Sequence, residues 1–264
     1  MTTWQRDSVA TELLACEAER RDRVRFTDEW TDMTLADGYA IQDETLRRRL
    51  ARGETLTGVK LGLTSRAKQE RMQVDQPLLA WLTDAMILPA GLPVDNARLI
   101  HARVEPEIVF ILGADLTGPG VSAATALASV AWVLGGAEVI DSRYRDFRFR
   151  APDVVADNAS SGAYVTGPVL LPPSALDLAQ ESVAVEVAGQ IVDTATGAAV
   201  LGHPAEALAL AANVLAERGL GLKAGQIVLT GGVTDAYPIP PGAHVAFHFA
   251  HLGSLHVTGG PSCP

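Results

Sequence analysis

The spacing of apolar and polar residues divides the chain into a helical N-terminal segment and a longer β-rich part. In the first part, Thr34 can cap a helix that ends near Gly53. The apolar residues near one face of that helix are Leu35, Tyr39, Leu46 and Leu50. Later apolar residues alternate with polar ones or form short β-branched runs, as strands do. We therefore expect one α+β domain, in which a helical segment over residues 1–56 joins a β-rich core over residues 57–264.

The same pattern predicts the individual elements. Strands are predicted over residues 58–63, 104–112, 136–141, 163–167, 226–232 and 244–257, with a hairpin over 182–194 that turns near Gly189. Helices are predicted over residues 65–72, 122–134 and 204–218, and a loop rich in Pro and Asp over 74–102. The Gly-rich triplets 118–120 and 230–232 are predicted to be turns.

Composition and charge exclude several classes of function. The chain has 264 residues, 48% of them hydrophobic and 20% charged, as is typical of a globular protein. Its 21 basic and 31 acidic residues give a formal charge of −10, which disfavours nucleic acid and anionic membranes as partners. No apolar run approaches the ~18–20 residues that span a bilayer, and the polar start lacks a signal-peptide pattern, so we expect a cytoplasmic protein. Cys16 and Cys263 belong to no CxxC pair, which argues against a disulfide framework.

Three glutamates on apolar strands are the strongest chemical signal. Glu105 and Glu107 are two residues apart, so on a strand they point to one face about 7 Å apart, and Glu138 lies in another apolar strand. Two like charges at ~4 Å repel each other by about 4 kcal/mol at an effective dielectric near 20. A hard divalent cation, Mg²⁺ or Mn²⁺, would cancel that repulsion. The spacing also fits glutamates that face solvent at a sheet edge, where Pro106 is tolerated.

Other polar residues add candidate chemistry. Lys60, in a short apolar strand, either extends to solvent or is held inside by an anionic ligand. Arg143 is a second candidate catalytic cation. Before a predicted strand lie residues that form either a turn or a set of donors for a substrate carboxylate, namely Asp157, Ser160 and Ser161. His244 and His248 would lie about 13 Å apart, too far for one ion. No GxSxG, GxGxxG or P-loop motif is present.

Six blocks of the sequence are informative when taken together. In chain order they are GVKLGLTSRAKQERMQVDQP, VEPEIVFILGADLTGPGVS, AEVIDSRYRDF, VVADNASSG, GAAVLGHPAEALALAANVLAERG and TGGVTDAYPIPPG. From about residue 30 to residue 257 the chain resembles the 4-oxalocrotonate decarboxylases. That family is grouped with the 2-hydroxypenta-2,4-dienoate hydratases in the fumarylacetoacetate hydrolase superfamily.

The resemblance implies a mixed β-roll or barrel core with flanking helices. It also implies a Mg²⁺ ion, with Mn²⁺ as an alternative, and makes Lys60 an active-site cation. The implied metal ligands are Glu105, Glu107 and Glu138. Decarboxylases of the family associate with the hydratase that consumes their product, so the resemblance implies a homo-oligomer and a complex with that hydratase.

We hypothesise that Leu78 marks the decarboxylase activity of the family. Hydratases carry an Asp directly after the Pro of the VDQP segment, where this chain has Leu78. Loss of CO₂ from 2-oxo-3-hexenedioate pushes electrons onto the C2 oxygen, which a divalent cation stabilises. The departing carboxylate should stay poorly solvated and unpaired, because pairing would favour the ground state over the transition state. Ala243 departs from the usual Asp of the family, and we expect a lost turn contact there.

We therefore predict a metal-dependent decarboxylase that converts the 2-oxo dicarboxylate 2-oxo-3-hexenedioate to 2-hydroxypenta-2,4-dienoate and CO₂ in meta-cleavage aromatic catabolism. One alternative is a 2-hydroxypenta-2,4-dienoate hydratase. Another is a non-catalytic partner subunit of such a hydratase. The second alternative is disfavoured by the intact polar set, which comprises Lys60, Glu105, Glu107 and Glu138.

Overall fold

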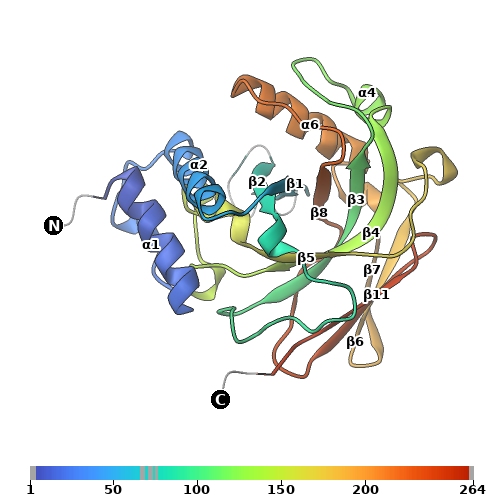
Figure 1. Ribbon diagram of the computed structural model, residues 1–264. Coiled ribbons are helices and arrows are strands. Elements are labelled where there is room, and N and C mark those ends of the chain that lie inside the picture. Colours follow the sequence, from blue (N-terminus) through green and yellow to red (C-terminus); the bar gives the residue numbers. More distant parts are fainter. Residues whose placement is uncertain (1–3, 66–68, 71–73, 75–76, 262–264) are drawn as a thin grey trace.

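Two sheets with helices on their flanks form the centre of the protein in a computed structural model that describes residues 4–65, 69–70, 74 and 77–261 (Figure 1). The α-helices are α1 (Arg6–Glu19), α2 (Leu35–Ala51), α4 (Ala123–Leu127), α5 (Ala151–Ala156) and α6 (Pro204–Glu217). The strands are β1 (Leu56–Gly62), β2 (Leu78–Thr83), β3 (Arg103–Leu112), β4 (Val130–Ile140), β5 (Ser161–Thr166), β6 (Ser182–Val187), β7 (Gln190–Thr196), β8 (Ile227–Gly232), β9 (Tyr237–Pro238), β10 (His244–Phe249) and β11 (Ser254–Thr258). Single 3₁₀ turns are η1 (Phe26–Asp28), η2 (Asp84–Met86), η3 (Arg145–Phe147), η4 (Asn158–Ser160), η5 (Pro173–Ala175) and η6 (Gly197–Ala199).

The larger sheet has the strand order β2-β1-β8-β3-β4-β5, with β9 also paired to β3. Only the β1–β8 pair among these is parallel. The smaller sheet has the order β11-β10-β6-β7. Long, curved β3 and β4 carry the larger sheet around the interior (Figure 1). The α+β prediction with a curled, barrel-like core and N-terminal helices is therefore confirmed.

The two faces of β3 have different surroundings, as the period of two along a strand requires. Ile108, Phe110 and Leu112 enter the main hydrophobic core, which the smaller sheet and α6 share. Val109 belongs to a smaller cluster on the other face, with Leu134 and Leu229 from the neighbouring strands. Glu105 and Glu107 lie on the Val109 side of the strand, so the fold carries them into the curve of the larger sheet.

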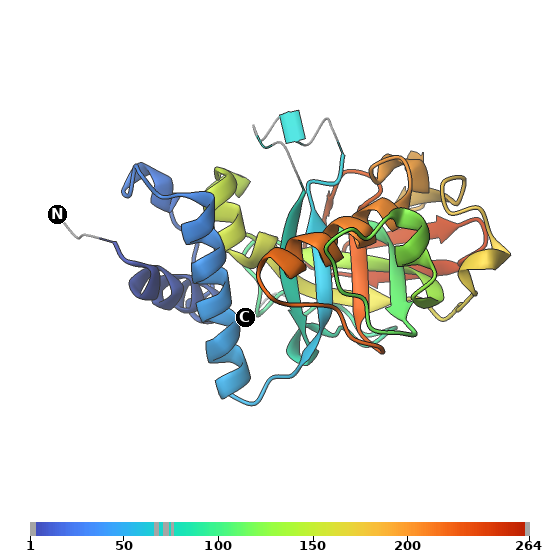
Figure 2. The same ribbon diagram turned by 90° about the horizontal axis from the view of Figure 1, so that it is seen from above.

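The N-terminal helices form a layer at one end of the molecule (Figure 2). Helix α2 begins as predicted: the Thr34 hydroxyl accepts a hydrogen bond from the Asp37 N–H at 3.2 Å, and the Asp37 carboxylate accepts one from the Thr34 N–H at 2.9 Å. The buried Gln42 amide donates to the backbone oxygens of Leu79 in β2 and Val155 in α5, at 2.9 and 3.1 Å. This contact joins the helical layer to the edge strand of the sheet.

The structure corrects two predicted elements. The helix predicted over 122–134 ends at Leu127, and β4 begins at Val130, because Val130 to Leu134 pairs with β3. Short apolar runs fit a helix or a buried strand equally well by periodicity. The loop predicted over 74–102 contains β2, whose six residues are all buried and show no alternation. The helix predicted over 65–72 falls mostly on residues outside the described part of the chain.

Residues 197–217 are, by length and composition, apolar enough to cross a membrane. Half of the segment is buried inside the protein. A turn with Leu201 and Gly202 in left-handed conformations interrupts it before α6 begins. His203 caps α6, as its place before Pro204 predicts, by accepting a hydrogen bond from the Ala205 N–H at 3.1 Å. This helix packs its alanine-rich face into the main core.

Candidate active site

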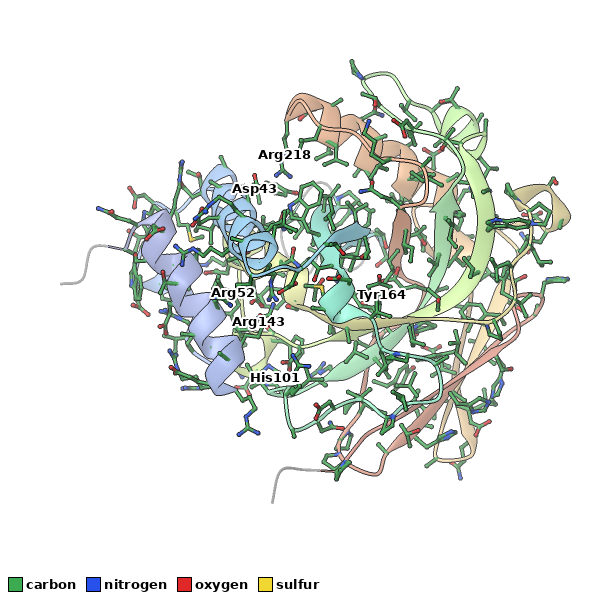
Figure 3. The ribbon with its side chains drawn as sticks, in the orientation of Figure 1. Asp43, Arg52, His101, Arg143, Tyr164 and Arg218 are labelled. Carbon is green, nitrogen blue, oxygen red and sulfur yellow. The ribbon has the colours of Figure 1, made fainter. Side chains whose placement is uncertain are left out.

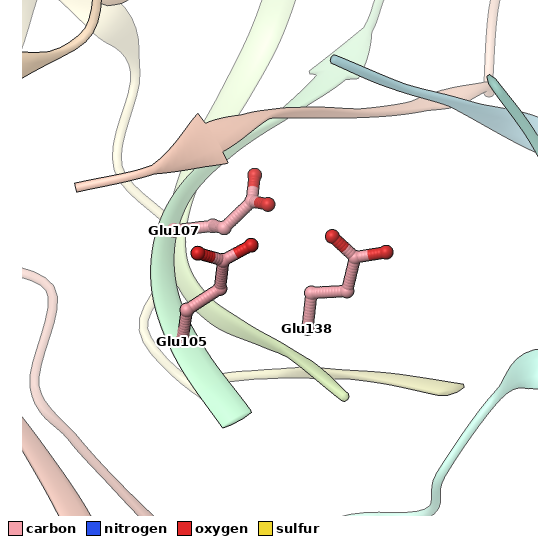
Figure 4. Close-up of side chains that lie close together, drawn as sticks. All are labelled: Glu105, Glu107 and Glu138. Carbon is pink, nitrogen blue, oxygen red and sulfur yellow. The ribbon is translucent and has the colours of Figure 1, made fainter. Parts of the chain in front are cut away.

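The register between β3 and β4 brings the three predicted metal ligands together. Glu105 faces Glu138 directly across the antiparallel pair, and Glu107 is two residues further along β3. One carboxylate oxygen from each glutamate lies within 4.8 Å of the others. Figure 4 shows the three carboxylates converging on one space between the strands. Three carboxylate oxygens this close together could bind one ion.

Burial rules out the solvent-exposed sheet edge as the place of these glutamates. Strand β3 lies between β8 and β4 in the sheet order. Glu107 and Glu138 have no exposed surface, and Glu105 is 9% exposed. Pro106 is accommodated inside the sheet, where its carbonyl accepts a hydrogen bond from the Val233 N–H at 2.9 Å. The glutamates are therefore interior groups that need compensation for their charge.

Two glycines at the end of β8 shape the space around these carboxylates. The Gly231 N–H donates to Glu107 Oε2 at 2.7 Å, from a backbone with a φ of 107°. Gly232 pairs with Glu107 across the strands, and a Cβ there would lie 2.1 Å from Glu105 Oε2. The prediction of a turn at 230–232 is wrong, because these residues are the last of β8. Their lack of side chains leaves room for the carboxylates.

The electrostatics of this cluster favour a bound cation. Burial, followed by the charges of Glu138 and Glu105, raises the pKa of Glu107 well above its usual value. Burial also raises the pKa of Glu138, against the opposing effect of the Lys60 ammonium. Among the described residues, Glu107 Oε1 has no hydrogen-bond partner although it is buried. A hard divalent cation fits this oxygen-only donor set and would satisfy that atom.

Lys60 points into the interior and does not extend to solvent. Its side chain is 3% exposed, and its Nζ lies 2.7 Å from Glu138 Oε2. The same ammonium donates to the Ala159 carbonyl at 3.0 Å. The Glu138 carboxylate of the protein itself therefore holds Lys60 inside, whereas the sequence suggested either solvent or an anionic ligand as its surroundings.

The segment before β5 supplies several of these contacts from a strained backbone. Asn158, Ala159 and Ser160 have φ values of 49°, 48° and 60°, in the left-handed region that non-glycine residues rarely occupy. The Asn158 amide holds the segment against β2 by hydrogen bonds to the N–H and the carbonyl of Trp81, both at 2.9 Å. At the start of β5, the Ser161 hydroxyl donates to Glu138 Oε1 at 3.3 Å. The strain is thus concentrated beside Lys60 and Glu138.

Arg143 and Asp157 form a buried ion pair behind this segment. The Arg143 guanidinium bonds to the Asp157 carboxylate and donates to the Asp157 and Asp141 carbonyls, both at 2.6 Å. It also donates to the Ser161 carbonyl at 3.1 Å. Although burial alone would lower it, the Asp157 carboxylate raises the pKa of Arg143. Figure 3 places Arg143 between the N-terminal helices and the sheet.

A cavity of about 330 Å³ reaches the cluster at Glu105, the one of the three glutamates that lines it. Its polar wall includes Lys60, Glu105 and Ser160, whereas Leu78 and Phe149 are among its apolar lining. Arg143, Asp157 and Ser161 are not part of its wall, and neither are the buried glutamates Glu107 and Glu138. The predicted residues therefore lie in three places: on the cavity wall, in the buried part of the glutamate cluster, and behind the segment before β5.

Sequence reasoning missed several residues of this site. The Gly231 N–H and the Ala159 carbonyl act through the backbone, so their residue types carry no signal. Gly232 could have been found from its position at the end of an apolar run, where a second glycine is unusual in a strand. Arg103 and Phe147 line the cavity; Phe147 ends the block AEVIDSRYRDF, but neither residue was singled out from the sequence.

The curled β-sheet and its buried cluster of three glutamates indicate an enzyme that binds a metal ion. Residues 55–258 match the family model of the fumarylacetoacetate (FAA) hydrolase C-terminal domain. The chain belongs to this family, which confirms the resemblance found in the sequence.

Individual relatives show which enzymes of the family this chain is similar to. Over 239 residues, 90% of each chain, the protein is 43% identical to a 4-oxalocrotonate decarboxylase from Pseudomonas sp. (strain CF600). It is 41% identical over 234 residues, 88% of this chain and 89% of the other, to a 2-hydroxyhexa-2,4-dienoate hydratase from Comamonas testosteroni. The solved 4-oxalocrotonate decarboxylase from Pseudomonas putida G7, complexed with magnesium and adipate, superposes with a TM-score of 0.94 at 39% identity and 98% coverage of both chains.

Proposed function

We propose that this protein is a divalent-metal-dependent decarboxylase of 2-oxo-3-hexenedioate. The observation that carries the proposal is the convergence of Glu105, Glu107 and Glu138 within 4.8 Å beside a cavity whose wall includes the apolar Leu78. Similarity to decarboxylases over nearly the whole chain supports it, as does the magnesium in the solved relative. The three glutamates would hold Mg²⁺ here, and Mn²⁺ would suit the same oxygen ligands.

The reaction separates the substrate into CO₂ and 2-hydroxypenta-2,4-dienoate. The electron pair of the C5–C6 bond shifts through the conjugated chain to the C2 oxygen, which then takes up one proton. When bound, the cation supplies Lewis acidity at the 2-oxo acid end of the substrate. The Lys60 ammonium, fixed between Glu138 and Ala159, is placed to give or receive a proton near that end. Leu78 contributes an apolar wall that keeps water from the departing carboxylate.

The remaining predicted site residues divide between contact and positioning. We propose that Ser160, on the cavity wall, contacts the substrate. Ser161 positions the Glu138 carboxylate through its hydroxyl. Arg143 and Asp157 hold the strained segment from behind, so we assign them a positioning role in place of the direct catalytic and substrate-binding roles expected from the sequence.

The test is to mix purified protein with 2-oxo-3-hexenedioate and follow CO₂ release and substrate absorbance, with added Mg²⁺ or with excess chelator. We expect CO₂ release that depends on the metal and is lost in Glu107→Gln, which removes a ligand charge at nearly constant volume. Glu186→Gln, on the strand β6 outside this site, is the matched control and should retain activity. Absence of CO₂ release from the metal-loaded wild-type protein would reject the proposal.

A hydratase of 2-hydroxypenta-2,4-dienoate is the second candidate. The 41% identity to a hydratase favours keeping it in the test. Metal-dependent consumption of 2-hydroxypenta-2,4-dienoate without CO₂ release from the dicarboxylate would establish this alternative. Turnover of either substrate would exclude a purely non-catalytic partner subunit.

We also propose that the protein is a cytoplasmic homo-oligomer that associates with the hydratase consuming its product. Trp132 and Leu170, which are 43% and 46% exposed, lie on neighbouring segments because Val133 bridges to Leu171. Burial of such large apolar side chains would favour a contact between subunits. Sedimentation of the protein alone, and then with the hydratase, tests the two associations separately.

A further inference from the structure

Arg103 is a cation on the wall of the candidate active site, where Asp235 also lies. It is the first residue of β3, two positions before Glu105, so the two side chains share a face of the strand. It lines the 330 Å³ cavity together with Glu105 and Lys60. Among the residues that the structure describes, Arg103 makes no ion pair and no hydrogen bond through its side chain. Its guanidinium contacts an aromatic ring: the guanidinium carbon lies 4.5 Å from the centroid of Phe147.

The Phe147 ring is held in place by an unusual backbone. Asp146 and Phe147 have φ values of 56° and 55°, both in the left-handed region. Non-glycine residues rarely adopt this conformation, and two in succession require support from the surrounding structure. The His101 ring contacts Phe147 at a centroid distance of 4.8 Å. Phe147 thus forms a fixed platform that orients the flat guanidinium of Arg103.

Lys60, the other cation on this wall, is already occupied. Its ammonium is shared between the Glu138 carboxylate and the Ala159 carbonyl. A dicarboxylate substrate brings two negative charges, and the glutamate cluster with its cation accounts for the 2-oxo acid end. Residues two apart on a strand, such as Arg103 and Glu105, have Cα atoms about 7 Å apart, a spacing similar to the length of a six-carbon chain.

We infer that Arg103, oriented by Phe147, binds the distal carboxylate of the substrate and selects dicarboxylates over monocarboxylates. The inference rests on the proposed function and adds the residue that binds the carboxylate at the far end of the substrate. It modifies the expectation that the departing carboxylate has no partner. A charge-assisted hydrogen bond to Arg103 strengthens binding, and part of it persists in the transition state, where the carboxylate still carries part of its charge.

This partial persistence gives a kinetic signature. In Arg103→Met, KM for 2-oxo-3-hexenedioate should rise about 10- to 100-fold, which corresponds to the loss of one hydrogen-bonded charge. The value of kcat should stay the same or increase, because the ground state loses more stabilisation than the transition state. Arg103→Lys should recover part of the KM change. A fall in kcat with an unchanged KM would overturn the inference.

A binding measurement separates this inference from the proposed reaction. Calorimetry of the Mg²⁺-loaded protein with adipate and with hexanoate compares a dicarboxylate with a monocarboxylate of the same chain length. We expect Arg103→Met to lower the affinity for adipate at least 10-fold and to leave the affinity for hexanoate unchanged, whatever reaction the protein catalyses. Lys223→Met, which removes a charge from an exposed pair with Asp115, is the control for net charge. An equal loss of affinity for both ligands, or no loss of affinity for adipate, would reject a role for Arg103 in recognition of the distal carboxylate.

Discussion

The Lys60 ammonium lies 2.7 Å from the Glu138 carboxylate, so the candidate proton donor and a candidate metal ligand form one buried ion pair. The two cations, Lys60 and the metal, would share the negative charge of the same glutamate. Charge in this site is therefore distributed over the cluster, and a change at one member alters the others.

Replacement of Lys60 by Met should separate catalysis from metal binding. We expect activity to fall by about 10²- to 10⁴-fold, the range that a positioned proton donor supplies. The affinity for Mg²⁺ should stay equal or increase, because a neighbouring positive charge has been removed. Titration with a metal indicator and turnover assays on the same variant test both expectations. A parallel loss of metal binding would show that Lys60 is needed to assemble the site.

Gly232→Ala should weaken the metal site through steric overlap. A methyl group there would lie 2.1 Å from Glu105 Oε2 and would displace that carboxylate. We expect Mg²⁺ affinity to fall at least 10-fold, about 1.4 kcal/mol or more. Gly136→Ala is the matched control, because its methyl group would meet Val109 at 2.4 Å. The control should lose thermal stability, and a selective loss of metal affinity in Gly232→Ala alone would support the steric account.

The stabilisation of the fold by Mg²⁺ should increase with pH. Burial raises the folded-state pKa of Glu107 and Glu138, so in the metal-free protein both groups favour folding when protonated and lose that contribution as pH rises through the raised pKa. A bound cation replaces the protons and removes this penalty. Thermal denaturation with Mg²⁺ and with chelator at about pH 5.5 and about pH 8 should show the larger difference in Tm at the higher pH. A difference that shrinks with rising pH would contradict the assigned ligands.

Leu78→Asp should lower decarboxylation, because it places an ionisable group on the apolar wall beside Lys60. We expect at least a 10-fold fall in kcat for 2-oxo-3-hexenedioate and a gain in hydration of 2-hydroxypenta-2,4-dienoate. Leu78→Met, which preserves the apolar volume, should remain close to the wild-type protein. If Leu78→Asp changes neither rate, Leu78 does not distinguish the two activities.

We propose that residues 1–264 form one domain, and a substitution of Gln42 tests this. Gln42→Met removes two buried hydrogen bonds that join α2 to β2 and α5. The free energy of unfolding should fall by about 1–3 kcal/mol, and the protein should still unfold in one transition. Two separate transitions in the variant or in the wild-type protein would show that the helical layer and the sheet are independent units.

The sequence by itself determined the local features of this protein. The spacing of Glu105 and Glu107 placed both carboxylates on one face of a strand, since side chains alternate along a strand whatever its neighbours. Thr34 and Asp37 specified the start of α2 through bonds that span three residues. The quoted blocks were sufficient to indicate the family, because order and residue type are preserved along the chain.

The tertiary structure decided every relationship that spans distant segments. The pairing register set Glu138 opposite Glu105, and the approach of η4 gave Lys60 its carbonyl partner at Ala159. Complete burial on both faces erased the alternation that would have identified β2, and pairing with β3 turned Val130 to Leu134 into strand. The buried ion pair of Arg143 with Asp157 also spans distant segments, and it is the reason why we propose a positioning role for Arg143. These outcomes depend on which strands pair and how deeply they are buried. Neither the pairing nor the burial can be predicted from the local pattern of residues.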